Sequence, residues 1–137
     1  MEIVKKASEM LEKCYEIILA SVSENGYPRA CVISKIKSEG IRKIWAATGL
    51  SSVKVRHFKA CPKASACFYR DGNSVTLVGK VSVIQDPAIK AEMWIDWFIE
   101  HFPGGIDDPN YCILEFEADE ATLWIDKEFI NLRREQL

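Results

Sequence analysis

The chain has 137 residues, of which 48% are hydrophobic and 28% charged, and its formal net charge is −2. These values predict one globular domain over residues 1–137, with a core of its own. They exclude an overall basic field that would attract nucleic acid or an acidic membrane surface. No apolar run approaches the roughly 20 residues that span a bilayer.

The five cysteines and the N-terminus indicate the compartment. The cysteine count is odd and no C-x-x-C pair occurs, which argues against a disulfide framework and against a zinc site. The chain begins with a charged, amphipathic stretch and not with a signal peptide. We therefore expect reduced thiols in a cytoplasmic protein, without a membrane anchor and without a metal.

The first half of the chain predicts one helix, three strands and a second helix. Residues 2–13 carry apolar side chains at helical spacing. Three strands are expected after it, separated by turns that include Glu24-Asn25-Gly26, and they run over Tyr15–Val22, Arg29–Ile36 and Arg42–Thr48. A short helix from Ser52 to Cys61 stops before Pro62.

The second half continues the strand pattern. Strands are expected over Ala64–Tyr69, Ser74–Gln85 and Tyr111–Ile125. Gly79 lies within the second of these and indicates a bulge or a bend. Asp86 followed by Pro87 predicts the start of a helix that runs to about His101. Residues 127–137 predict a short terminal helix.

Six strands joined by hairpin turns, with three to four helices, predict a mainly β protein. The spacing of the turns suits a small closed antiparallel barrel with helices over its openings. Some strands are apolar on both faces, as in Val75–Val78, so one face fills the barrel and the other needs cover. Helices or a second subunit can supply that cover, and a homodimer is therefore expected.

The stretch Ile44–Arg56 is the most informative about function. It predicts a buried strand that ends in a turn of small residues and enters a helix. Thr48, Ser52 and Lys54 gather at that turn, where a helix N-terminus presents unpaired N–H groups and a positive dipole end. Such a group of donors can bind a phosphate or another anion. The alternative is an ordinary serine N-cap beside a solvated lysine.

This stretch, preceded by Gly26-Tyr27-Pro28-Arg29-Ala30-Cys31-Val32-Ile33, resembles the flavin-binding split barrel of the pyridoxamine 5'-phosphate oxidase-like proteins. The Gly-x-Pro turn, the strand that ends in threonine and the T-x3-S-x-K step follow the order of that family. The loop from Phe102 to Pro109 resembles a small bacterial and archaeal branch. The resemblance covers most of residues 14–126. It implies a six-stranded antiparallel split β-barrel of Greek-key type, with FMN bound at the interface of a homodimer.

The resemblance also implies which residues contact FMN. Thr48, Ser52 and Lys54 would hold the phosphate, and main-chain groups of residues 30–32 would meet the isoalloxazine ring. The full implied set is Arg29, Ala30, Cys31, Val32, Ala47, Thr48, Ser51, Ser52, Lys54 and Trp124. A family arginine that faces the phosphate aligns either with Arg29 or with Cys31. Trp124 either reaches the partner's flavin or packs at the end of the barrel.

No acid–base constellation points to catalytic residues. His57 is expected on the surface of its helix, and His101 closes another helix. True pyridoxamine phosphate oxidases end in an arginine-rich tail that binds substrate. Arg133 and Arg134 lie on the expected terminal helix and do not match that tail, so oxidation of vitamin B6 is not expected.

The expected function is therefore that of an FMN-dependent oxidoreductase with an unknown small substrate. In such an enzyme the cofactor carries the difficult chemistry, and the protein supplies orientation and access. Two alternatives remain open. One is a non-catalytic protein that binds or stores flavin, and the other is a relative that binds haem or a deazaflavin.

Overall fold

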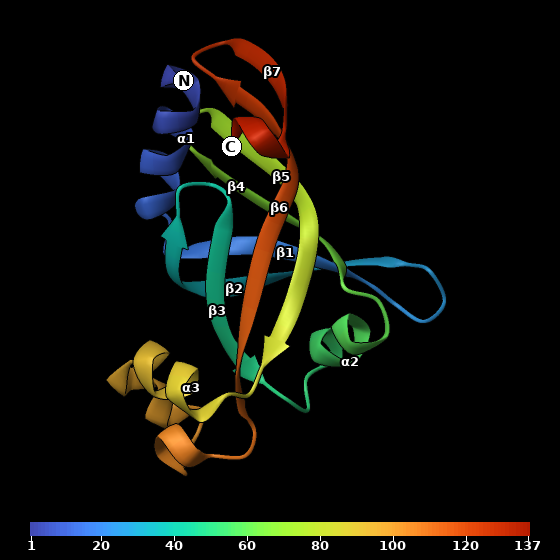
Figure 1. The fold of residues 1–137 in the computed structure, drawn as a ribbon, viewed down its shortest axis with the longest axis vertical. Helices are drawn as coiled ribbons and strands as arrows, with labels where there is room; N and C mark the ends of the chain where they lie inside the picture. The colour runs from blue at the N-terminus through green and yellow to red at the C-terminus, as the bar shows by residue number, and fades with distance from the viewer.

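Seven antiparallel strands form one sheet that closes on itself in the computed structural model, which describes residues 1–137 (Figure 1). The strands are β1 (Glu16–Val22), β2 (Pro28–Glu39), β3 (Lys43–Gly49), β4 (Lys63–Arg70), β5 (Asn73–Ile84), β6 (Tyr111–Ile125) and β7 (Glu128–Arg133). Their order is β3-β2-β1-β4-β5-β6-β7, and β3 also pairs with β6. That pairing closes six strands into a barrel and leaves β7 outside. The expected mainly β, six-stranded antiparallel barrel is confirmed.

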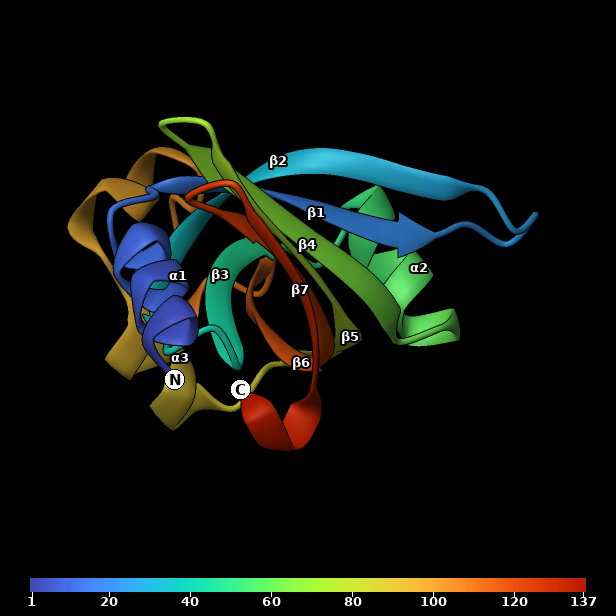
Figure 2. The same ribbon diagram turned by 90° about the horizontal axis from the view of Figure 1, so that it is seen from above.

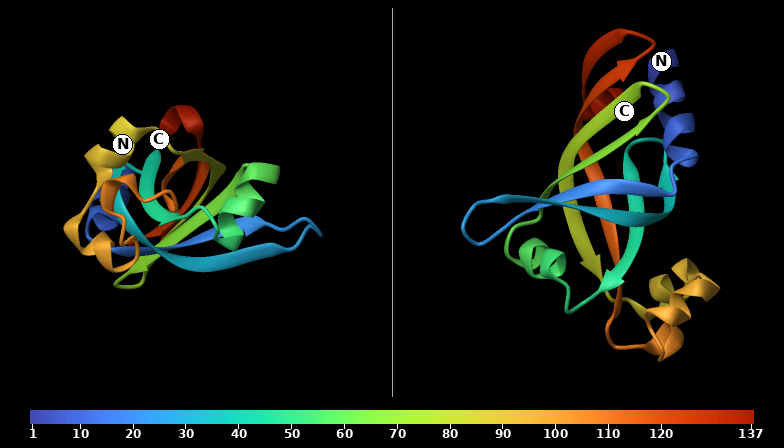
Figure 3. Two further views of the ribbon diagram at one scale, coloured as in Figure 1. Left: turned by 90° about the horizontal axis from the view of Figure 1, so that it is seen from below. Right: turned by 180° about the vertical axis from the view of Figure 1, so that it is seen from behind.

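Three α-helices and three short 3-10 turns surround the barrel. They are α1 (Glu2–Glu12), α2 (Val53–Ala60), α3 (Pro87–Met93), η1 (Asp96–Glu100), η2 (Gly105–Asp107) and η3 (Arg134–Gln136). Both chain ends and α1 lie at one end of the molecule, whereas α2 and α3 lie at the other (Figures 1 and 3). None of these helices is long and apolar enough to cross a membrane.

Two hydrophobic clusters hold these elements together. The larger fills the barrel, where alternate residues of β5, such as Val75 and Leu77, point inward and α1 adds Leu11. The smaller lies outside the barrel wall, beneath α3 and η1, and consists of Trp45, Met93, Phe98, Phe102, Tyr111 and Ile113. The smaller cluster fixes the segment from Trp94 to Phe102 against β3 and β6, which is the region of the candidate site.

The bulge expected at Gly79 is confirmed, with its extra residue, Asp119, on the facing strand β6. The pairing of β5 with β6 shifts register between Val78 and Gly79. A Cβ atom at position 79 would lie 1.9 Å from the carbonyl oxygen of Glu117. Only glycine allows β6 to approach so closely, and the resulting bend helps the sheet to close.

Strand β2 changes its partner halfway along. Residues Pro28–Ser34 pair with β1, whereas Lys35–Glu39 pair with β3. A register irregularity lies between Lys35 and Lys37. The first half of β2 therefore separates from β3 and continues with β1 into a hairpin that projects from the body (Figure 2). The barrel is split between β2 and β3 on the side where β3 leads into α2.

The predicted terminal helix over residues 127–137 is wrong. Asp126 and Lys127 adopt positive φ angles of 52° and 66° and make a tight turn. The chain then pairs with β6 as β7, and only residues 134–136 form a helical turn. Leu132 is buried in the core, so packing and strand pairing outweigh the local preference for helix.

The predicted helix from Asp86 to His101 is also interrupted. Its start is confirmed, because the Asp86 side chain accepts hydrogen bonds from the N–H groups of Ala88 and Ile89. However, α3 ends at Met93, and Trp94 has an extended backbone. The ring of Trp94 packs edge-on against Tyr111, with centroids 5.2 Å apart. A continuous helix would rotate this ring away, so aromatic packing accounts for the break.

Candidate cofactor site

A cleft of about 360 Å³ opens where β2 separates from β3. Five parts of the chain line it: the edge of β2, the end of β3, the first turn of α2, the aromatic segment beyond α3 and the loop before β6. The lining residues are Val32, Ile33, Ser34, Ala47, Thr48, Gly49, Lys54, Trp97, Phe98, His101, Phe102 and Asn110. The cleft thus combines apolar and aromatic side chains with polar groups, as ligand sites commonly do.

The edge of β2 offers unpaired main-chain groups to this cleft. The N–H of Lys35 donates to the carbonyl oxygen of Tyr15 at 2.8 Å. Antiparallel pairs alternate between hydrogen-bonded and non-hydrogen-bonded positions, so the peptide groups of Ala30, Val32 and Ser34 face away from β1. Because β3 joins β2 only from Lys35 onward, the N–H groups of these residues have no strand partner and can hydrogen-bond to a ligand.

The turn between β3 and α2 is held by Asn110, which precedes β6. Its side-chain oxygen accepts the N–H of Ser51 at 3.0 Å, and its carbonyl accepts the N–H of Leu50 at 2.7 Å. A Cβ atom at Gly49 would lie 2.9 Å from the Asn110 amide nitrogen, so this packing favours glycine. The turn is therefore rigid before any ligand binds.

Thr48 is buried at the end of β3, with 8% of its surface exposed. The Cys112 thiol donates to the Thr48 carbonyl oxygen at 3.4 Å. Burial raises the pKa of Cys112 to about 11, although the positive charges of Lys59, Lys90 and Lys54 oppose the shift. The thiol is therefore protonated at neutral pH. It acts as a hydrogen-bond donor and not as a nucleophile.

Ser52, which adjoins the cleft without lining it, carries the most informative polar atom of this turn. It occupies the N-cap of α2 but makes no capping hydrogen bond, and its Oγ is buried without any partner. Buried polar groups without partners are rare in folded proteins. No other side chain of the protein has such an atom. An unused donor at the start of a helix is expected where a ligand completes the hydrogen bonding.

The charges around the cleft favour an anion. Lys54 lines the cleft from the first turn of α2 and makes no ion pair, and none of the lining residues is acidic. The first N–H groups of α2 have no partner within the helix. The Ser52 hydroxyl, the Lys54 ammonium and this helix N-terminus together suit the phosphate of FMN.

The structure brings four of the ten implied residues to the lining of this cleft, and Ser52 lies at the adjoining N-cap of α2 without lining it. Ala47, Thr48, Lys54 and Val32 line the cleft, and Ala30 lies next to Val32 along the same edge of β2. Three others lie at its margin or point elsewhere. Ser51 is exposed beside the turn, Arg29 is exposed and pairs with Ser21, and the Cys31 thiol donates to the Leu19 carbonyl at 3.6 Å.

Trp124 lies far from the cleft within one chain. It pairs with Phe129 at the end of β6 that is remote from Tyr111 and Thr48. Its ring packs against that of Phe129, with centroids 5.1 Å apart. Its expected contact with the partner's flavin stays a prediction.

The aromatic wall of the cleft was not expected from the sequence. Trp97, His101 and Phe102 reach the site from the segment beyond α3, and Asn110 from the loop before β6. The rings of Trp97 and His101 meet edge to face, with centroids 5.6 Å apart. The one available signal is the clustering of aromatic residues between positions 94 and 102, which by itself is equally typical of packing contacts.

The prediction that His57 lies on the surface is wrong. Only 2% of its surface is exposed, because the face of α2 that carries Val55 and Phe58 packs on the barrel. Its Nδ1 lies 2.8 Å from Ser21 Oγ, and its Nε2 lies 3.7 Å from the Glu24 carboxylate. His57 thus fastens α2, which carries Lys54, to the projecting hairpin.

Comparison with known proteins identifies the family. The family model described as pyridoxamine 5'-phosphate oxidase matches residues 3–125. The chain belongs to this family. No protein of curated function matches the chain.

Solved structures share the fold of this member of the pyridoxamine 5'-phosphate oxidase family. A Clostridium acetobutylicum protein related to general stress protein 26 is 27% identical over 98% of this chain and 96% of its own, with a TM-score of 0.87. An FMN-binding protein of the family from Nostoc punctiforme is 15% identical, covers 95% and 92% of the two chains, and has a TM-score of 0.69.

A third structure extends the range of ligands found on this fold. A haem-binding protein from Mycobacterium smegmatis is 15% identical, with a TM-score of 0.76 over 97% of this chain and 58% of its own. At such identities the two weaker matches share the fold alone. The ligand of the present chain therefore has to be argued from its own residues.

Proposed function

We propose that the protein binds FMN in the cleft between β2 and β3 and acts as a flavin-dependent oxidoreductase on a small substrate. The observation that carries the proposal is the unpartnered Ser52 hydroxyl beside Lys54, at the N-terminus of α2. FMN, when bound, supplies the redox chemistry. The chain's own residues bind it, orient it and exclude water from it.

Each part of the cleft takes one part of FMN in this proposal. Thr48, Ser52 and Lys54 hold the phosphate. The unpaired peptide groups of Val32 and Ser34 hydrogen-bond to the polar edge of the isoalloxazine ring. The apolar side chains that line the cleft exclude water from the ring.

A homodimer with FMN at its interface is part of the proposal. On the outer face of the sheet, one row of paired side chains crosses four strands. The row consists of Val32, Ile18, Cys67 and Thr76. Val32 is 64% exposed. The neighbouring row is Ala30, Ala20, Ser65 and Val78. Small and apolar residues on an open sheet face suit a second copy of the chain.

The same outer face continues to Trp124, so a partner can bring its own Trp124 to the cleft. The proposed location is the cytoplasm. All five cysteines are free, which agrees with a reducing compartment.

The absorption spectrum of the purified protein tests the cofactor first, because flavin, deazaflavin and haem absorb at different wavelengths. A flavin spectrum without NAD(P)H oxidation would favour the alternative of a flavin-binding or storage protein. A haem spectrum would reject the proposal.

Titration with FMN and riboflavin tests the phosphate site. We expect Lys54→Ala to weaken FMN binding by about 1.5–3 kcal/mol, the range for a hydrogen bond to a charged group, and to leave riboflavin binding nearly unchanged. Lys59→Ala, in the last turn of the same helix, is the matched control and should change neither affinity. Equal losses of FMN and riboflavin affinity in Lys54→Ala would remove this lysine from the phosphate site.

A further inference from the structure

A second hollow, of about 340 Å³, adjoins the cofactor cleft. It is lined by Tyr15, Ser34, Lys35, Ile36, Ile95, Trp97 and Phe98. Three of these residues, Ser34, Trp97 and Phe98, also line the cofactor cleft. The two hollows are therefore neighbours that share one wall, and a molecule in the second would lie beside a ligand in the first.

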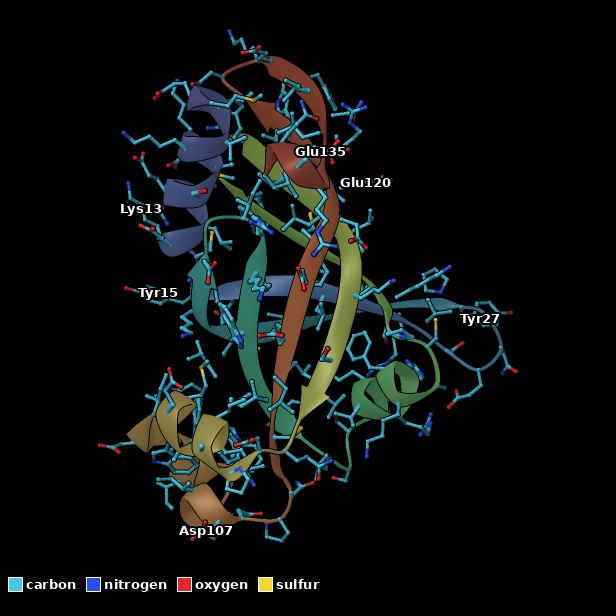
Figure 4. All side chains as sticks on the ribbon, in the orientation of Figure 1. Lys13, Tyr15, Tyr27, Asp107, Glu120 and Glu135 are labelled. Carbon is cyan, nitrogen blue, oxygen red and sulfur yellow. The ribbon has the colours of Figure 1, made fainter.

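The second hollow is mostly apolar and open to solvent. The Tyr15 side chain is 83% exposed, that of Trp97 46% and that of Ile95 38%. Tyr15 projects between α1 and the segment around α3 (Figure 4). Large apolar side chains gathered around an open hollow favour a ligand with an apolar body, because its binding removes their surface from water. Three aromatic rings, those of Tyr15, Trp97 and Phe98, favour a planar one.

One charge faces this ligand site. Lys35 is the only charged residue of the lining, and it makes no ion pair or side-chain hydrogen bond. Burial lowers its pKa, although the negative charges of Cys14 and Glu12 act in the opposite direction. A half-buried ammonium without a partner carries an uncompensated cost of desolvation, which a bound anion would reduce.

We propose that this hollow binds an aromatic compound with a single carboxylate, whose ring packs against Trp97 and Tyr15 and whose carboxylate pairs with Lys35. The inference deepens the proposed function, on which it rests for the claim that this ligand is the substrate of the flavin. A single ammonium matches one negative charge better than the two charges of a phosphate ester.

Binding of benzoate, benzyl alcohol and benzylamine tests the proposal, measured by calorimetry on the full-length protein with and without FMN. Benzoate should bind the FMN-loaded protein at least about tenfold more tightly than benzylamine, a difference of about 1.4 kcal/mol. Lys35→Met, which keeps the apolar stem, should weaken the binding of benzoate by about the same factor and leave the binding of benzyl alcohol unchanged. Lys37→Met, two positions along β2 and outside the hollow, is the matched control. Trp97→Ala should weaken both benzoate and benzyl alcohol.

Three results would overturn the proposal. These are equal affinities for benzoate and benzylamine, an unchanged benzoate affinity in Lys35→Met, and competition between benzoate and FMN, which would place benzoate in the cofactor cleft. A protein that binds benzoate through Lys35 but never binds FMN would support the site and reject the proposed flavin function. The two failures are therefore distinguishable.

Discussion

Replacing Ser52 by alanine should leave the unliganded protein nearly as stable as before. A serine N-cap ordinarily stabilises its helix, and its loss costs about 0.5–2 kcal/mol. In this protein Ser52 Oγ makes no bond to α2 and is buried without a partner. Removing an unsatisfied buried hydroxyl removes a cost as well as a side chain. We therefore expect a change in the free energy of unfolding within about 0.5 kcal/mol, in either direction.

The same substitution should be costly once FMN is bound. A hydroxyl that donates to a phosphate makes a hydrogen bond to a charged group, which contributes about 1.5–3 kcal/mol. The dissociation constant of FMN should therefore rise by about 10- to 150-fold. That of riboflavin, which has no phosphate, should not change.

Urea unfolding without ligand and titration with both flavins measure the two effects. Asp86→Ala is the matched control, because Asp86 is a working N-cap whose carboxylate accepts from Ala88 and Ile89 at 2.8 and 3.3 Å. It should lose about 0.5–2 kcal/mol of stability and keep both flavin affinities. The reasoning is refuted if Ser52→Ala destabilises the unliganded protein as much as Asp86→Ala does and lowers the affinity for FMN no more than that for riboflavin.

Three further predictions follow from other parts of the molecule. Gly79→Ala should lower the free energy of unfolding by about 3 kcal/mol or more, measured in urea, because its Cβ would lie 1.9 Å from the Glu117 carbonyl oxygen; a neutral effect would show that the bulge is pliable. Light scattering at micromolar concentration should give twice the chain mass of 15.6 kDa, and a monomer holding one FMN per chain would contradict the interface site. Pyridoxal phosphate formation should be negligible, because Arg134 pairs with Glu117 at 2.6 Å and Arg133 with Glu135 at 3.1 Å. Neither arginine lines the cofactor cleft, so neither is placed to bind a substrate phosphate there. Turnover within about tenfold of that of an authentic oxidase, which corresponds to a difference of about 1.4 kcal/mol in the activation barrier, would show that the protein does oxidise vitamin B6.

Local signals in the sequence predicted the elements whose causes are local. The Asp86-Pro87 pair starts a helix because the carboxylate caps it and proline suits its first turn. Gly79 predicted the bulge because a bend within a strand needs a residue without a side chain. Thr48 and Lys54 line one cleft because a single turn connects them, and their spacing in the sequence already indicated this.

Features that depend on distant segments could not be predicted. Residues 128–133 form a strand because β6 offers an edge and the core accepts Leu132, and neither fact is visible in those six residues. Asn110 reaches the β3–α2 turn, and Trp97 reaches the cleft, from segments about 50 residues further along the chain. His57 is buried because Ser21 and Glu24 supply its polar partners from another element.

The change of partner along β2 gives this strand two halves, one that pairs with β3 and one whose edge toward β3 is open. Residues 35–39 pair with β3, whereas the amide protons of Val32 and Ser34 have no strand to protect them. These amides should exchange rapidly with solvent deuterium in the empty protein and slowly once a ligand occupies the gap. Because β6 and residues 35–39 of β2 hold β3 in the sheet, substitutions along the first half of β2 can change the edge that faces a ligand while the sheet stays closed.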